Sequence, residues 1–195
     1  MLRFLALWLC FVALPATAAA EWHLTPMAGA TFFGKTSLVD IENAAGKVHP
    51  HLGAAVTLVG GGVLGVEALA VWMPGFFQTG DLNLVRKSRS VAVMGNAVLT
   101  TPRRWTEYSL RPFISGGLGV LHASAADTAN LIPVNANGLA FNIGGGAIGF
   151  LSARTGLRFD VRYYGTLQNL DEQAVSFGPV NLRYMTASIG VVLRR

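Results

Sequence analysis

The chain has 195 residues, of which 13% are charged, and its formal net charge at pH 7 is +5. Soluble domains carry about 25% charged residues, so the composition argues against an ordinary water-exposed surface, and the basic residues are too scattered to indicate nucleic-acid binding. The single cysteine, Cys10, excludes a disulfide framework and a cysteine metal site.

The N-terminal segment, residues 1–20, has the pattern of a secretory signal peptide. Arg3 supplies a positive charge, residues 4–14 are an apolar run, Pro15 ends that run, and residues 16–20 are small. The run is too short for a conventional membrane-spanning helix. We therefore expect cleavage after Ala20, which leaves residues 21–195 as one barrel domain. A retained N-terminal anchor is the alternative.

Apolar side chains then recur with a period of two, which is the period of a β-strand. In residues 157–164, Leu157, Phe159 and Val161 share one face, while arginines and an aspartate occupy the other. A helix would not separate them in this way. The same alternation marks residues 22–32, 51–58, 64–72, 91–99, 114–120, 139–149, 157–164 and 184–193.

These segments predict an all-β fold, an eight-stranded antiparallel up-and-down transmembrane β-barrel. Their lengths are close to what a tilted strand needs to cross a bilayer. The second face of each segment is small or polar and carries few charges, so it fits the narrow interior of an eight-stranded barrel better than a solvated exterior.

The connections support the same architecture. Short links at residues 60–62, 101–110 and 152–156 alternate with longer ones at residues 34–48, 74–90, 124–137 and 165–180. Outer-membrane barrels have short periplasmic turns and longer extracellular loops, so both ends of the domain are expected in the periplasm. Aromatic residues near the predicted strand ends are expected to form interfacial girdles: Trp72, Phe76, Phe77, Trp105, Tyr108, Phe150 and Tyr184.

Two other architectures are considered. Residues 52–66 and 128–153 are uncharged, but they contain glycines and, in the second case, Pro133, so they lack the continuous apolar character of membrane helices. A soluble periplasmic barrel of the lipocalin kind would need polar outward faces, which these strands do not show.

Six segments carry a resemblance to a known family: LGVE at 64–67, PGFF at 74–77, RPF at 111–113, GGLG at 116–119, NIGGG at 142–146 and GLRFDVRYY at 156–164. They resemble the outer-membrane-protein β-barrel family, the broad OmpA-like and OmpW-like group of eight-stranded barrels. The resemblance implies an outer-membrane location and insertion by the barrel-assembly machinery. One departure is that the chain ends in Arg195, where family members usually end in an aromatic residue that the machinery recognises.

Three motifs suggest chemistry, but each has a structural interpretation that we favour. Gly144, Gly146 and Gly149 match a dinucleotide fingerprint, yet no helix is predicted after them. His122 and Ser124 are a possible hydrolase pair without an evident acidic partner. His49 and His51 share a face without a nearby carboxylate cluster, which argues against a metal site. We therefore predict no catalytic, cofactor-binding or metal-binding residues and no cofactor.

The best-founded site is a group of charges on the predicted lumen face: Glu67, Arg158, Asp160 and Arg162. A buried charge in a narrow barrel must be paired. We expect an ion-pair network that plugs and rigidifies the barrel. The competing interpretation is that the same charges line a narrow conductive path.

These observations indicate a non-enzymatic outer-membrane barrel with a structural or surface-contact role. A narrow pore or a passage for small hydrophobic compounds, of the OmpW-like kind, is one alternative, and a lipid-modifying outer-membrane enzyme is another. The expected partners are outer-membrane lipid, lipopolysaccharide and, during insertion, the assembly machinery. We expect a monomer that does not bind nucleic acid.

Overall fold

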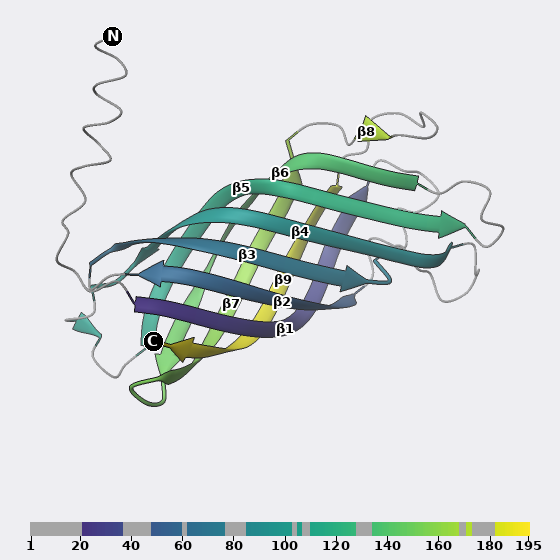
Figure 1. Cartoon of the computed structure of the whole chain (residues 1–195). Helices are drawn as coiled ribbons and strands as arrows, with labels where there is room; N and C mark the ends of the chain where they lie inside the picture. Colours follow the sequence, from purple (N-terminus) through teal and green to yellow (C-terminus); the bar gives the residue numbers. More distant parts are fainter. Residues whose placement is uncertain are drawn as a thin grey trace, which may run out of the picture.

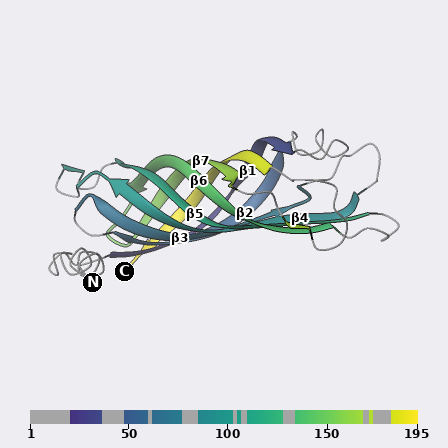
Figure 2. The same cartoon turned by 90° about the horizontal axis from the view of Figure 1, so that it is seen from above.

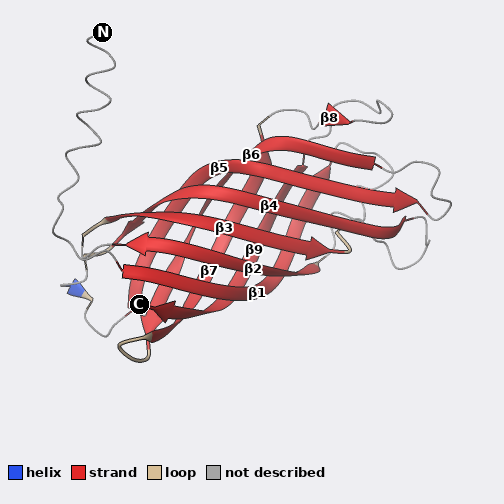
Figure 3. Cartoon of the chain, in the orientation of Figure 1, coloured by secondary structure: helices blue, strands red, loops and turns tan. Residues whose placement is uncertain are grey.

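In the computed structural model, almost all of the described chain is β-strand (Figures 1 and 3). The structure describes residues 21–36, 48–59, 62–76, 85–102, 105–106, 110–127, 134–167, 171–172 and 182–195. The predicted signal peptide lies outside these residues. Within them, no helix is long and apolar enough to cross a membrane.

Eight long antiparallel strands form a closed barrel, as the sequence predicts, and a two-residue strand, β8, is added to β6. The hydrogen-bonded order is β5-β4-β3-β2-β1-β9-β7-β6, and pairing of β5 with β6 closes the ring. The strands are β1 (Glu21–Thr36), β2 (His49–Val59), β3 (Leu64–Pro74), β4 (Val85–Thr100), β5 (Leu110–Asp127), β6 (Val134–Phe150), β7 (Thr155–Thr166), β8 (Asp171–Glu172) and β9 (Leu182–Arg194).

Burial follows the predicted alternation. In β7, Arg158 and Asp160 are buried, whereas Phe159 and Val161 are 51% and 47% exposed on the outer face. Trp72 on β3 is likewise exposed, and its chain neighbour Val71 is buried. The exterior is therefore apolar, and the lumen holds the polar and charged side chains together with part of the apolar ones.

The connections at one end of the barrel are short. In the turn after β2, the Val63 carbonyl accepts a hydrogen bond from the Thr100 amide at the end of β4, at 2.8 Å. The turn after β6 is closed by a hydrogen bond from the Leu151 amide to the Thr155 carbonyl. The backbones of Trp22 and Arg195 pair at the same end. We call this the turn end and the opposite end the loop end.

Several strands are longer than the apolar alternation indicates. At the loop end, β4 continues beyond its pairing with Pro74 of β3, and β5 continues to Asp127 (Figures 1 and 2). There Arg89 is exposed and His122 is half-buried. The hydrophobic pattern marks only the apolar part of a strand, whereas the backbone hydrogen bonds to the neighbouring strand continue beyond that part. For the same reason Ser124, which the alternation placed at the start of the connection over residues 124–137, lies within β5 together with His122.

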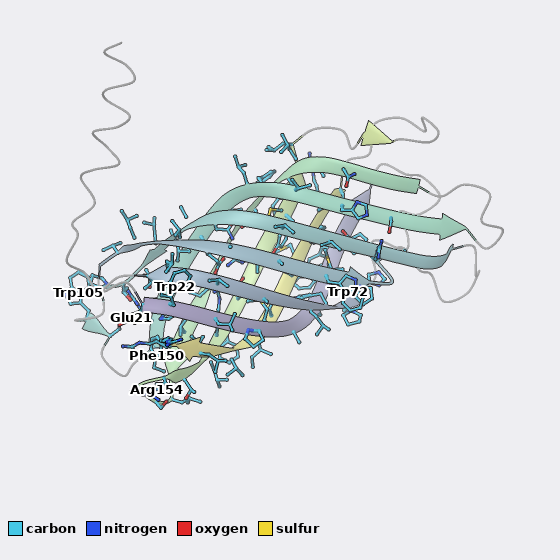
Figure 4. All side chains as sticks on the ribbon, viewed as in Figure 1. Glu21, Trp22, Trp72, Trp105, Phe150 and Arg154 are labelled. Atoms are coloured by element: carbon cyan, nitrogen blue, oxygen red, sulfur yellow. The ribbon has the colours of Figure 1, made fainter. Side chains whose placement is uncertain are left out.

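The predicted aromatic girdle is only partly correct. Trp72 and Trp105 are exposed near opposite ends of the barrel (Figure 4). Phe76 and Tyr184 are instead fully buried, and the ring of Phe150 packs against His23. Successive side chains of a strand face the lumen and the exterior in turn. An aromatic residue near a strand end therefore faces the lumen or the exterior according to its place in that alternation. Phe77 and Tyr108 lie outside the described residues.

Candidate functional site: the charged layer of the lumen

The four predicted lumenal charges come from opposite walls of the barrel. Glu67 lies on β3, while Arg158, Asp160 and Arg162 lie on β7. Three strands separate β3 from β7 on each side of the ring. Contacts between Glu67 and the two arginines therefore cross the lumen. We call these four residues and their polar partners the charged layer.

Each arginine in the layer pairs with both carboxylates. Arg158 contacts Glu67 Oε2 and Asp160 Oδ2, each at 2.6 Å. Arg162 contacts Glu67 Oε1 at 2.8 Å through Nη2 and Asp160 Oδ1 at 2.7 Å through Nε. Two positive and two negative charges thus form a closed cycle with no formal net charge. Such an arrangement offsets part of the desolvation cost that each ion would have alone.

Neutral side chains complete the hydrogen bonding of this cycle. Asn96 Nδ2 on β4 donates to Glu67 Oε1 at 3.0 Å, and Thr57 Oγ1 on β2 donates to Glu67 Oε2 at 3.2 Å. Asn142 Nδ2 on β6 donates to Asn96 Oδ1 at 2.7 Å. The layer therefore connects five strands, and the carboxylate of Glu67 has partners on three others.

Glycines provide space for the charged side chains. Gly144 and Gly146 on β6 are the cross-strand partners of Arg162 and Asp160. A Cβ atom at Gly144 would lie 2.5 Å from Arg162 Cγ, and one at Gly146 would lie 1.8 Å from the Phe159 carbonyl oxygen. Neither position accepts a side chain without displacement of its neighbour. The motif that resembles a dinucleotide fingerprint is thus part of a strand that packs against the charges.

All four charged residues are almost fully buried. Their exposed fractions are 2% for each arginine and 3% for each carboxylate residue. The Arg158 guanidinium also lies 4.4 Å from the centre of the Phe113 ring, so an aromatic face covers it on the turn side. Charge interactions are stronger in such a dry environment than at a wet surface.

Clusters of buried apolar and aromatic side chains lie in the lumen on both sides of the charged layer. Toward the turn end lies a small cluster of Val98, Phe113, Ile148 and Val192. Toward the loop end, the Tyr164 and Tyr184 rings stack with centroids 4.9 Å apart, and Phe76 contacts Tyr184 edge to face at 5.4 Å. We call Phe76, Tyr164 and Tyr184 the aromatic layer.

A turn after β3 places Phe76 in this aromatic layer. Gly75 adopts a φ of 70°, a left-handed conformation that favours glycine, and its amide donates to the Ser88 carbonyl at 2.8 Å. The chain thereby bends inward over the lumen. The PGFF segment at residues 74–77 indicates a turn, but it does not predict that the Phe76 ring faces the lumen.

Among the described residues, no group of three or more potential metal ligands is found. His49 and His51 share the lumen face, as expected from their spacing. His51 contacts Ser188 Oγ at 2.8 Å and Thr31 Oγ1 at 3.2 Å. It is a hydrogen-bonded structural histidine.

The possible hydrolase pair has other partners. His122 Nδ1 contacts Asn137 Oδ1 at 2.6 Å, and Ser124 Oγ accepts a hydrogen bond from Arg89 Nε at 3.2 Å. A Ser–His catalytic arrangement needs the histidine beside the nucleophile and an acidic group that orients it. The described contacts of His122 and Ser124 supply neither.

Sequence reasoning missed the neutral members of the charged layer and a further buried arginine. Arg111 on β5 is 2% exposed and donates to the carbonyls of Thr101 at 2.9 Å and Gly62 at 3.2 Å. It connects two links at the turn end. The alternation of β5 around Ile114 places Arg111 on the lumen face, so extending the strand by a few residues would have revealed it.

Comparison with solved structures shows the fold of outer-membrane barrels. Neisserial surface protein A is 10% identical with a TM-score of 0.56, over 88% of this chain and 96% of that one. Ail, the attachment invasion locus protein of Yersinia pestis, is 13% identical with a TM-score of 0.54, over 90% and 99%. OprG of Pseudomonas aeruginosa is 12% identical with a TM-score of 0.54, over 91% and 97%.

No family model and no curated protein matches the chain. At the identities above, the structural likeness concerns the fold. The chain is a closed antiparallel barrel of the kind that these eight-stranded outer-membrane proteins share.

Proposed function

We propose that the chain is a non-enzymatic integral outer-membrane barrel with a sealed lumen and a structural or surface-contact role. The observation that supports this most directly is the division between its two faces. Apolar side chains such as Phe159 and Val161 are exposed, while charged side chains such as Arg158 and Asp160 are buried. Only a lipid environment makes that division favourable, because burying charges and exposing apolar surface would both destabilise the barrel in water.

The proposed seal is the charged layer together with the apolar clusters beside it. Eight strands enclose just enough space for side chains. The ion pairs of Glu67 cross the lumen to β7, and the exposed fractions of the four charged residues leave almost no room for water around them. This packing favours a plug over a water-filled path.

Surface contact is supported by the architecture and by one neighbour. The fold presents its longer connections at the loop end, and Ail is named for attachment and invasion. We propose export by the N-terminal segment and insertion by the barrel-assembly machinery. We further propose that the loop end faces the cell exterior among lipopolysaccharide molecules, and that the barrel functions as a monomer.

Membrane fractionation followed by gel electrophoresis tests the location and the fold together. The protein is expected in the outer-membrane fraction, and the unboiled form is expected to migrate differently from the boiled form because a barrel resists detergent unfolding. Recovery in the soluble fraction, with equal migration of the two forms, would overturn the proposal.

Planar-bilayer recording tests the seal. The wild-type barrel is expected to show no steady conductance, because the ion pairs hold Arg158 and Arg162 across the lumen. Steady conductance that Asp160→Ala abolishes would instead identify a narrow pore lined by these charges. Liposome swelling with small solutes provides an independent measurement of the same property.

A further inference from the structure

A bulge near the loop end of β1 changes which side chains face outward. Phe33 adopts a φ of 54°, and the register between β1 and β9 shifts between Phe32 and Lys35. A positive φ is unfavourable for a bulky residue, and such strain is often found at functional sites. A bulge also redirects the side chains that follow it. The bulge therefore destabilises this part of β1. The new direction that it gives to the Lys35 side chain is a functional reason for keeping it.

The bulge turns Lys35 to the outside. Before it, even-numbered residues of β1 such as Leu24 are exposed and odd-numbered residues such as Thr31 are buried. After it, odd-numbered Lys35 is exposed. An uninterrupted strand would have directed the lysine into the lumen.

The new direction places two positive charges opposite each other. Lys35 is the cross-strand partner of Arg183 on β9, and both residues are exposed. Like charges directly opposite on neighbouring strands destabilise a sheet. Within the described part of the chain, neither residue has a carboxylate in ion-pair contact. A bound anion would turn this unfavourable pair into a favourable one.

Apolar and aromatic residues lie next to the pair on the side of the lipid-facing belt. Phe32 is opposite Met185, and Met185 is opposite Tyr163 of β7. The Phe33 ring is 71% exposed and contacts the Phe32 ring edge to face at 5.1 Å. Aromatic residues of membrane barrels concentrate at the level of the lipid headgroups, and cationic side chains extend to the same interface.

We propose that Lys35 and Arg183 bind a phosphate group of lipopolysaccharide in the outer leaflet, with Phe32 and Phe33 against its acyl chains. The inference rests on the proposed outer-membrane location with the loop end outside. Phosphate is the anion that two neighbouring cations can share, since its oxygens accept several charge-assisted hydrogen bonds. The exposed phenylalanine ring beside the cations favours a lipid over free phosphate.

Native mass spectrometry of the full chain, folded in a neutral detergent and titrated with lipid A, measures this binding. Replacing Lys35→Gln or Arg183→Gln is expected to weaken binding about fivefold each, from the usual contribution of one cation near anionic lipid. The double variant is expected to lose about tenfold or more. Lipid A treated with phosphatase is expected to bind the wild type as weakly as intact lipid A binds the double variant.

Arg154→Gln is the matched control, because Arg154 is an exposed cation at the turn end (Figure 4). It should leave lipid A binding unchanged. Equal binding by the wild type and the double variant would overturn the inference, as would equal binding of intact and phosphatase-treated lipid A. Gel migration of each variant, boiled and unboiled, shows separately whether the barrel has folded, so failure of the site is distinguished from failure of the proposed function.

Discussion

The charged layer and the aromatic layer occupy neighbouring levels of one lumen, but different forces stabilise them. In the charged layer, Arg158 and Arg162 each contact two carboxylates, so every member depends on the presence of the others. In the aromatic layer, Tyr164, Tyr184 and Phe76 fill volume through ring contacts. The comparison teaches that the interior of a narrow barrel can be packed by charge complementarity at one level and by ring contacts at the next.

The largest effect is expected in the charged layer from Asp160→Ala. This change leaves two buried arginines with one shared carboxylate, and breaking a buried pair in this way costs about 3–5 kcal/mol. Urea unfolding of the barrel in lipid vesicles measures the loss. Ser115→Ala is the control, because this lumenal hydroxyl has no hydrogen-bond partner among the described residues. If Asp160→Ala costs no more than Ser115→Ala, the layer does not stabilise the barrel.

Truncation in the aromatic layer is expected to have the next largest effect, of comparable size. Tyr184→Ala removes a fully buried ring that contacts Tyr164 and Phe76, and loss of a large core side chain costs about 3 kcal/mol or more. The same unfolding experiment measures it. A small cost would mean that the loop-end lumen is loosely filled, and the distinction between the two layers would then fail.

A double-mutant cycle on Glu67 and Arg162 sharpens the comparison further. Because their 2.8 Å contact crosses the lumen, Glu67→Gln and Arg162→Gln should be non-additive, with a coupling free energy of about 1–3 kcal/mol. The corresponding cycle between Glu67 and Tyr184 should be close to additive. Equal coupling in both cycles would show that the layers are not independent.

The smallest effect is expected from Tyr184→Phe. The Tyr184 hydroxyl is buried and has no hydrogen-bond partner in the described structure, so its removal should leave stability unchanged or raise it by about 1 kcal/mol. This variant separates the contribution of the ring from that of the hydroxyl. A clear loss of stability would indicate a hydrogen bond that the described contacts do not include.

The charged layer could be predicted because alternation leaves few choices for a charge. Arg158, Asp160 and Arg162 alternate with Leu157, Phe159 and Val161, so in a lipid-facing strand the charges can only point inward. Glu67 alternates with Val66 and Ala68 in the same way. The barrel itself followed from eight repetitions of this rule, together with the alternation of short and long connections.

Other features could not be predicted because they depend on the register between strands or on local backbone geometry. The hydrogen bond between Asn142 and Asn96 joins β6 to β4, which are not adjacent in the ring. The alternation of side chains along each strand does not determine where the two residues lie along the barrel axis. Phe76 and Tyr184 were expected at the interface because aromatic residues near strand ends are common there. The bulge at Phe33 has no distinctive local sequence signal beyond Gly34.

Site-directed spin labelling in lipid vesicles tests the central claim most directly, namely that apolar residues face lipid and charged residues face a closed lumen. A nitroxide at Val161→Cys, on the outer face between Asp160 and Arg162, is expected to collide readily with oxygen dissolved in the bilayer and rarely with a water-soluble nickel complex. Frequent collision with the nickel complex, at a level expected for a solvent-exposed strand, would contradict the account.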